Sequence, residues 1–249
     1  MSKINQILQE WTPGMVITSS WLRSKGIDKR LADSYVKNNW LERVARGVFK
    51  RSGDHVDWPG VVRALQKDGI KLHPGGKTSL ELQGYGHYIK MGGSEKLVFW
   101  KTPETWVPGW FKEVLAENVF RITSVRLFHE ELNSLKQVTV DNISIQTSVP
   151  ERAILEYLYD VPHKEGFDEA WYLMEGLTSL RPSLLQPLLV DCRSVKVKRL
   201  FMYLAEIHNH PWLKRLESSN IDFGSGKRSI VKGGKLNKKY GITVPANMD

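Results

Sequence analysis

Residues 18–51 read TSSWLRSKGIDKRLADSYVKNNWLERVARGVFKR, and their pattern predicts the fold of the N-terminal part of the chain. Thr18 can cap a short first helix, because its hydroxyl can accept a bond from a backbone N–H that has no partner inside the helix. Gly26 can take the left-handed conformation that ends helices, and Asp28 can cap a second helix at its positive dipole end. Two helices joined by a short turn that contains glycine form the helix-turn-helix pattern.

The second helix, predicted over residues 29–38, has one apolar and one basic face. At helical spacing the apolar face carries Leu31, Ala32, Tyr35 and Val36. In a recognition helix, the N-terminal residues reach base edges and other residues contact phosphates. The predicted DNA contacts of this motif are therefore Ser19, Ser20, Lys29, Arg30, Ser34 and Lys37. The alternative is an ordinary amphipathic helix whose basic face is solvated.

A two-stranded ribbon is predicted directly after this helix, over residues 40–51. Its strand formers flank Arg46 and Gly47, which supply the turn. A basic ribbon in this position, a wing, can enter a minor groove or lie along phosphates. The residues predicted to project from the wing toward DNA are Arg43, Arg46, Lys50 and Arg51. The order of helix, glycine turn, capped helix and basic ribbon favours DNA binding over a merely solvated hairpin.

Length and composition indicate a globular protein. The 249 residues suffice for a large core, most simply as two domains. The single Cys192 excludes an internal disulfide and a multi-cysteine zinc site. The first residues lack the apolar core of a signal peptide, and no apolar run approaches the ~20 residues of a spanning helix. We therefore expect no membrane partner and a cytoplasmic location.

Charge is concentrated at the two ends of the chain. Residues 1–56 carry a net charge of +5, residues 57–192 carry −4 and residues 193–249 carry +8, which together give the overall +9. Basic segments of this kind point to contact with a polyanion more than a uniform excess would.

The rest of the chain has a mixed pattern. Helices are expected at residues 2–11, 54–69, 77–83, 108–117, 150–160, 167–177, 182–192 and 195–208. Strands are expected at 97–100, 119–128 and in pieces over 221–244, and a hairpin that turns at Asp141 and Asn142 is expected at 138–147. We therefore predict an α+β fold. Its domains are a winged helix-turn-helix domain at residues 1–93 and a larger mixed α/β domain at residues 94–249.

The segments that suggest enzymatic chemistry each lack residues that the corresponding motif requires. The segment HPGGKT at residues 73–78 lacks the first glycine of a phosphate loop, because that position is Lys71. His208 and His210 have no further metal ligand at suitable spacing, and no acidic residue is followed two positions later by lysine, as a restriction-type nuclease requires. We therefore predict no enzymatic activity, no cofactor and no metal.

Two glycine-rich basic segments near the C-terminus, at residues 224–228 and 232–235, each allow two interpretations. Their backbones suit phosphate binding, but they also suit plain hairpin turns. The cations of this second basic patch are Lys227, Arg228, Lys232 and Lys235.

Several blocks together resemble the AbiEi antitoxins of the AbiE, or type IV, toxin–antitoxin class. They are NWLERVARGVF at residues 39–49, HPGGKTSLELQGY at 73–85, VPERAILE at 149–156, HPWLKR at 210–215, GSGKR at 224–228 and VKGGKL at 231–236. The resemblance covers nearly the whole chain.

The resemblance implies a winged helix-turn-helix domain joined to an antitoxin domain. It implies that the protein binds double-stranded operator DNA, represses its own operon and opposes an AbiEii-like nucleotidyltransferase toxin without a stable complex. On this basis the second basic patch would serve either additional phosphate contacts or toxin opposition. The competing class is a nucleic-acid-processing enzyme with a DNA-binding N-terminal domain.

Overall fold

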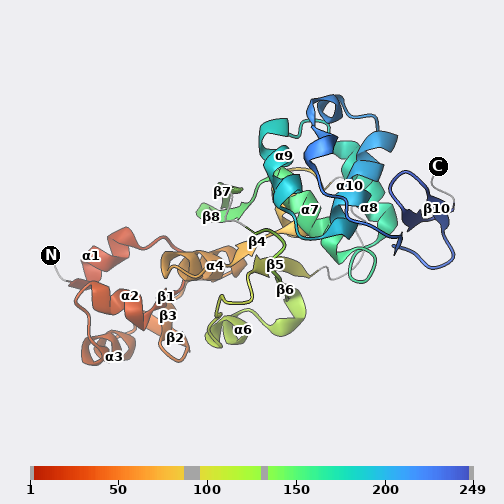
Figure 1. Ribbon diagram of the computed structural model, residues 1–249. Coiled ribbons are helices and arrows are strands. Elements are labelled where there is room, and N and C mark those ends of the chain that lie inside the picture. The colour runs from red at the N-terminus through yellow and green to blue at the C-terminus, as the bar shows by residue number, and fades with distance from the viewer. Residues whose placement is uncertain (1–2, 87–95, 130–133, 247–249) are drawn as a thin grey trace. The chain divides into compact units, whose positions relative to one another are not determined.

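The computed structural model describes residues 3–86, 96–129 and 134–246, and its helices and strands are drawn in Figure 1. Both element types occur throughout, which confirms the predicted α+β class. From residue 3 to residue 74 the elements are α1 (Lys3–Glu10), β1 (Ile17–Thr18), α2 (Ser19–Ser24), α3 (Lys29–Lys37), β2 (Leu41–Ala45), β3 (Val48–Arg51), α4 (Trp58–Lys67) and β4 (His73–Pro74).

The remaining elements include most of the helices. From residue 76 to residue 148 they are α5 (Gly76–Leu82), β5 (Leu97–Lys101), α6 (Trp110–Val114), η1 (Glu117–Val119), β6 (Phe120–Ser124), β7 (Leu135–Val140) and β8 (Ile143–Ser148). Beyond them follow α7 (Pro150–Asp160), α8 (Phe167–Gly176), α9 (Pro182–Asp191), α10 (Val195–Ile207), η2 (Pro211–Arg215), η3 (Ser218–Asn220), β9 (Arg228–Ser229), β10 (Lys235–Asn237) and β11 (Ile242–Val244).

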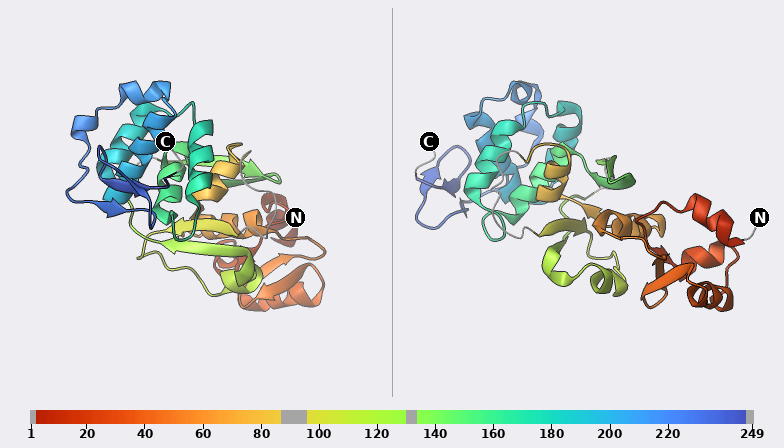
Figure 2. Two further views of the ribbon diagram at one scale, coloured as in Figure 1. Left: turned by 90° about the vertical axis from the view of Figure 1, so that its right-hand side faces the viewer. Right: turned by 180° about the vertical axis from the view of Figure 1, so that it is seen from behind.

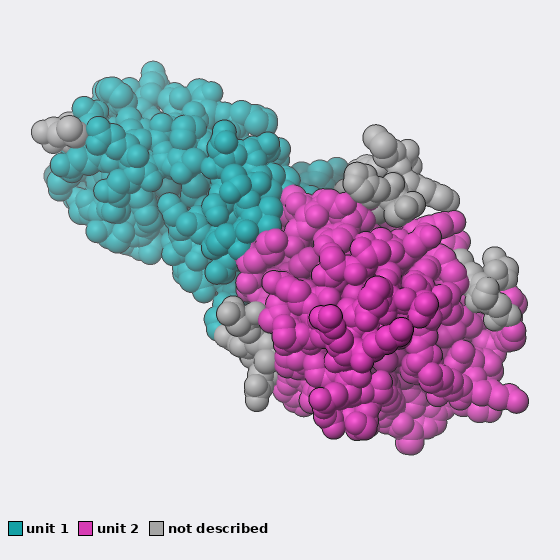
Figure 3. Space-filling view, turned by 90° about the horizontal axis from the view of Figure 1, so that it is seen from above, with its two compact units in different colours: residues 1–73, 94–123, 137–146 teal, residues 74–93, 124–136, 147–249 magenta. Residues whose placement is uncertain are grey.

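The chain forms two compact units, coloured separately in Figure 3. Each unit is built from three separate segments: residues 1–73, 94–123 and 137–146 in the first, and residues 74–93, 124–136 and 147–249 in the second. The predicted domain boundary at residue 93 lies outside the described residues, and it stays a prediction.

The N-terminal elements of the first unit form a winged helix-turn-helix. Their sheet has the strand order β1-β3-β2 and is antiparallel, with Ile17 opposite Phe49. Figure 2 shows α2 and α3 beside this sheet at the N-terminal end of the chain. Leu22, Ile27 and Leu41 are buried beneath them, so burial of apolar surface holds the motif together.

The turn and both helix starts have the predicted local causes. The hydroxyl of Thr18 accepts a hydrogen bond from the backbone N–H of Trp21 at 3.2 Å, and a carboxylate oxygen of Asp28 accepts one from Leu31 at 2.8 Å. Gly26 has φ 73°, the left-handed conformation that ends α2. The predicted caps and the glycine turn are therefore confirmed.

The wing is the hairpin formed by β2 and β3. Ala45 pairs with Val48, so Arg46 and Gly47 form a two-residue turn, and Gly47 has φ 75°. Turns of this length need a positive φ because their twist must match that of the strands. The predicted wing is confirmed, with an irregularity in register between Arg43 and Ala45.

An aromatic cluster packs the later segments of the first unit against α4. Phe99 of β5 lies 6.1 Å from Trp58, 5.7 Å from Phe111 and 6.0 Å from Phe120, measured between ring centroids. Tilted and edge-to-face rings are the arrangement that aromatic pairs prefer. This cluster explains why residues beyond position 94 pack with the N-terminal segment.

Three predicted elements are clearly shorter than expected, and one of them is the helix predicted over residues 54–69, which spans Trp58–Lys67. The strand predicted over residues 119–128 ends at Ser124, because the backbone of the following segment bonds elsewhere: Phe128 bridges to Cys192, and the N–H of Arg193 donates to Leu127. The helix predicted over residues 108–117 spans only Trp110–Val114 and is followed by the short η1. The hairpin turn predicted at Asp141 and Asn142 is confirmed, since both have positive φ.

The second unit is mainly helical, with α7 and α10 at its centre. Figure 1 shows α8 and α9 packed around them. Nearly every residue of α7 is buried, including Glu156. One carboxylate oxygen of Glu156 accepts from the backbone N–H of Gly76 at 3.0 Å and from the hydroxyl of Ser148 at 2.8 Å, and the other accepts from Arg152 at 2.7 Å. A buried charge is tolerated because it is bonded this fully.

Candidate nucleic-acid interface

The basic face of α3 carries free cations. Lys29, Arg30 and Lys37 are exposed, and none of them has a bonding partner within the described part of the chain. Lys29 and Arg30 occupy the first turn, where a recognition helix approaches base edges. Ser20 is also exposed, and the hydroxyl of Ser34 lies 3.4 Å from the side-chain amide of Asn38. This helix face can therefore offer donors to a polyanion.

The tip of the wing holds one further free cation. Arg46 is exposed in the turn and has no partner among the residues described. Ser19, which was predicted to contact DNA, instead fixes this turn: its backbone N–H and its hydroxyl both donate to the carbonyl of Gly47, at 2.7 and 3.1 Å. The start of α2 thereby positions the wing tip.

Arg43 joins the wing to α3. Its guanidinium lies 2.6 Å from a carboxylate oxygen of Asp33 and 5.4 Å from the ring centroid of Phe49. Both charged groups are close to half exposed, so the pair itself contributes no more than about 1 kcal/mol. Its geometric effect is to hold β2 against the basic helix.

The last two predicted wing contacts face other protein groups. The amine of Lys50 lies 2.9 Å from the carboxylate of Glu42 and donates to the carbonyl of Asp54 at 2.9 Å. Arg51 donates to the carbonyls of Leu8 and Trp11 and stacks over the Trp11 ring. The carbonyl of Leu8 belongs to the last turn of α1, where carbonyls lack helical partners. Arg51 is thus bound inside the domain, a role that strand alternation alone cannot distinguish from projection.

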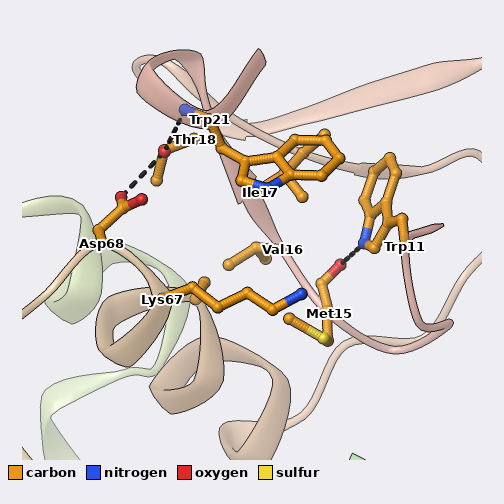
Figure 4. Close-up of a pocket in the computed structure, with 9 residues that line it drawn as sticks. Trp11, Met15, Val16, Ile17, Thr18, Trp21, Lys67 and Asp68 are labelled. Atoms are coloured by element: carbon orange, nitrogen blue, oxygen red, sulfur yellow. Dashed lines mark hydrogen bonds between the residues drawn. The ribbon is translucent and has the colours of Figure 1, made fainter. Parts of the chain in front are cut away.

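Figure 4 shows how α4 supports the start of α2. The hydroxyl of Thr18 donates to the carboxylate of Asp68 at 2.9 Å while it accepts from Trp21. The side chain of Lys67 lies along the same narrow cavity, where burial, together with the nearby Arg63, lowers its pKa. The helix-turn-helix is therefore anchored to the rest of the first unit.

The second basic patch lies in the C-terminal part of the second unit. Lys227, Arg228, Lys232 and Lys235 are all exposed. Lys227 lines a cleft, and the guanidinium of Arg228 donates to the carbonyl of Lys227 at 3.1 Å.

The histidines and the other quoted blocks serve the core. His210 is buried, its Nε2 lies 2.7 Å from the carbonyl of Met174, and its ring stacks on Trp212 at 5.0 Å. Lys77 forms a buried ion pair with Glu169 at 2.7 Å. In the parts that the structure describes, no three histidine, cysteine or acidic side chains are grouped to hold a metal.

Glu156 and Arg199 organise the second unit, and no role for either was predicted. Glu156 ends the block at residues 149–156, but only its burial and that of Arg199, each with several bonding partners, indicate what they do. No helix among the described residues is long and apolar enough to cross a membrane.

Comparison with known proteins places both parts of the chain in related families. Residues 1–91 match the family described as transcriptional regulator, AbiEi antitoxin N-terminal domain. Residues 94–245 match the family described as transcriptional regulator, AbiEi antitoxin, type IV TA system. No curated protein matches the chain.

A solved structure is similar to this chain in fold. It is the crystal structure of the RV2827C protein from Mycobacterium tuberculosis, with a TM-score of 0.62 and 12% sequence identity. The match covers 96% of this chain and 88% of that chain. At this identity the likeness concerns the fold alone.

Proposed function

The chain belongs to the AbiEi antitoxin family of transcriptional regulators of type IV toxin–antitoxin systems, and from this membership we propose that it binds operator DNA through its winged helix-turn-helix. Binding at the operator represses its own operon. The N-terminal turn of α3 enters the major groove, and the wing lies along the adjacent phosphates or in the minor groove.

The observation that carries this proposal is the distribution of free and engaged cations. Lys29, Arg30 and Arg46 have no internal partner among the described residues, whereas Arg43 and Arg51 hold the motif together. A cation without an internal partner can contact a phosphate without first giving up another bond. The free cations therefore mark the contact surface, and the engaged ones set its shape.

The test of operator binding uses the DNA upstream of the gene. We expect the full chain to protect a defined segment of this DNA from cleavage and to bind it more tightly than a shuffled duplex of equal composition. Equal affinity for both duplexes, with no protected segment, would refute operator recognition.

We further propose that the protein opposes a nucleotidyltransferase toxin in the cytoplasm without forming a stable complex with it. Family membership supports this role. Co-expression of the chain with the toxin of its operon should restore growth, and the two purified proteins should elute separately in size-exclusion chromatography. Growth arrest that persists at full antitoxin expression would contradict the role, and coelution would contradict the absence of a complex.

We propose no nuclease activity for the chain. The absence of an acidic residue two positions before any lysine supports this view, because that pair is typical of restriction-type metal sites. Incubation of the pure protein with supercoiled plasmid, RNA and Mg²⁺ should leave both substrates intact. Cleavage that is lost in an acidic-residue variant would favour the competing enzyme class.

A further inference from the structure

The second unit has a cleft whose volume is about 770 Å³. This volume falls in the range of sites that hold small organic ligands. It is lined by parts of a glycine-rich loop, of the segment that follows it and of α10. The lining residues are Phe223, Gly224, Gly226 and Lys227 of the loop, Leu236, Lys238, Lys239, Tyr240 and Gly241 of the following segment, Arg199 and Glu206 of α10, and Ser218. Neither the winged helix nor family membership accounts for this cleft.

A buried arginine on α10 holds the glycine-rich loop in place through hydrogen bonds to its carbonyls. Arg199 is only 5% exposed, and its guanidinium donates to the carbonyls of Phe223 at 2.8 Å, Gly224 at 3.0 Å and Gly226 at 2.6 Å. Charge-assisted hydrogen bonds of this kind are among the strongest in proteins. The loop is therefore held with these carbonyls directed at one point.

Two backbone N–H groups of this loop are consequently directed away from Arg199, whereas those of Gly224 and Arg228 bond to Asp222 and Gly241. In a trans peptide unit the N–H points opposite to the carbonyl, so the N–H groups of Ser225 and Lys227 point away from Arg199. Neither N–H has an acceptor among the residues described. Gly224 and Gly226 have φ of 59° and 73°, and left-handed residues within a turn create the concave row of N–H groups that binds anions.

The cleft also presents two free amines. Lys227 and Lys238 line it and make no ion pair or hydrogen bond through their side chains within the described segments. Lys239, by contrast, is paired with Glu206 at 2.5 Å. The cationic character of the cleft therefore comes from groups that are available to a ligand.

An aromatic wall stands beside these cations. Phe223 and Tyr240 both line the cleft, with ring centroids 6.1 Å apart in an edge-to-face arrangement. Burial raises the pKa of Tyr240, and its hydrogen bond to Glu206 adds to this effect. The phenol thus stays neutral. Tyr240 is buried, so the partly exposed ring of Phe223 is the apolar surface that a sugar or base can contact.

We propose that this cleft binds a nucleotide through its phosphate groups. The donors are the side-chain amines of Lys227 and Lys238, together with the backbone N–H group of Lys227, all from residues that line the cleft. The binding site goes beyond the proposed regulatory function and does not depend on DNA binding by the first unit.

The test is a calorimetric titration of the full chain, without DNA, with each of the four ribonucleoside triphosphates. We expect saturable binding of at least one of them and its displacement by inorganic pyrophosphate. The double variant Lys227→Gln/Lys238→Gln should weaken binding by about tenfold or more, because it removes both charged donors. The matched control Lys232→Gln/Lys235→Gln removes the same charge from residues outside the cleft wall and should bind as the wild type does.

Three results would overturn the proposal. The first is no saturable binding of any of the four nucleotides up to about 1 mM, the weakest affinity that a specific site would show. The second is an equal loss of affinity in both double variants, which would indicate a general charge effect. The third is a failure of pyrophosphate to compete. Stronger competition by a short single strand with a 5′ phosphate than by the same strand without it would support the site and identify a strand end as the source of the phosphate.

Discussion

Arg46 and Arg51 lie five positions apart in the sequence, yet their surroundings differ completely. The guanidinium of Arg51 bonds to the carbonyls of Leu8 and Trp11, whereas Arg46 is exposed at the wing tip. Sequence analysis assigned both to DNA because both are basic residues of a ribbon. The alternation of residues along a strand predicts on which face a side chain lies. It does not predict that this side chain bonds to a carbonyl 40 positions away, as that of Arg51 does.

Arg51→Met should therefore reduce stability. The substitution removes charge-assisted hydrogen bonds to two carbonyls and keeps much of the apolar stem, so we expect the free energy of unfolding to fall by about 2 kcal/mol. Arg46→Gln should leave it unchanged within about 0.5 kcal/mol. Urea unfolding of the two variants measures both values. Equal stability of the two variants would mean that the Arg51 contacts do not hold the domain together.

Glu42 should make the thermal stability of the wing depend on pH in the acidic range. Hydrogen bonds from the backbone N–H of Gly53 and from Lys50, followed by the Ser52 hydroxyl, lower the pKa of Glu42 to about 2 from 4.5. A group with a lowered pKa in the folded state contributes stability above its unfolded pKa and loses it as the pH falls through its folded pKa. The melting temperature of wild type should exceed that of Glu42→Gln at pH 7.

This difference should shrink as the pH falls from about 4.5 toward about 2. Thermal melts of both proteins across this range measure it. A difference that stays constant with pH would show that the carboxylate charge has no part in holding the wing.

The elements themselves were well predicted where their causes are local. The caps at Thr18 and Asp28, the glycine that ends α2 and the turn at Asp141 and Asn142 each depend on residues within a few positions. The short strand β6 was not predictable, because Leu127 and Phe128 pair with the segment around Cys192 instead. Such long-range bonds leave no periodic signal in the sequence.

The wing turn allows a matched test at this scale. Gly47→Ala and Gly53→Ala both place a side chain at a φ near +75°, which costs about 1 to 2 kcal/mol. An added Cβ at Gly47 would also lie 3.1 Å from the hydroxyl oxygen of Ser19, whereas one at Gly53 meets nothing within 4 Å.

We therefore expect both variants to lose stability and only Gly47→Ala to lose additional affinity for DNA, because the Ser19 contact positions the wing tip. Affinity measured by fluorescence anisotropy, on samples shown to be folded, separates the two effects. Equal affinity of the two variants would remove Ser19 from the positioning of the wing.

At the scale of the whole molecule, the charge pattern was visible in the sequence but the composition of the compact units was not. The excess of basic residues at both ends follows from a count of charged residues in the sequence. The grouping of residues 94–123 with the N-terminal segment depends on aromatic contacts such as those of Phe99 with Trp58 and Phe120. Neither the hydrophobic pattern nor the glycine-rich stretch near residue 93 specifies such contacts.

We propose that the free cations on α3 and the wing bind duplex DNA. Each phosphate contact releases counterions, so affinity falls with salt by a log–log slope of about −0.9 per contact. The decisive measurement is the salt dependence of operator binding by wild type and by two triple variants. One is Lys29→Gln/Arg30→Gln/Arg46→Gln. Its control is Lys136→Gln/Lys214→Gln/Arg215→Gln, which removes the same charge from exposed positions outside the winged helix.

We expect the first variant to bind more weakly and to have a slope that is shallower by up to about 2.7, the value for three lost phosphate contacts. The control variant should keep the affinity and the slope of the wild type. Identical slopes and affinities for the two variants would contradict the claim that the winged helix is the DNA-binding surface.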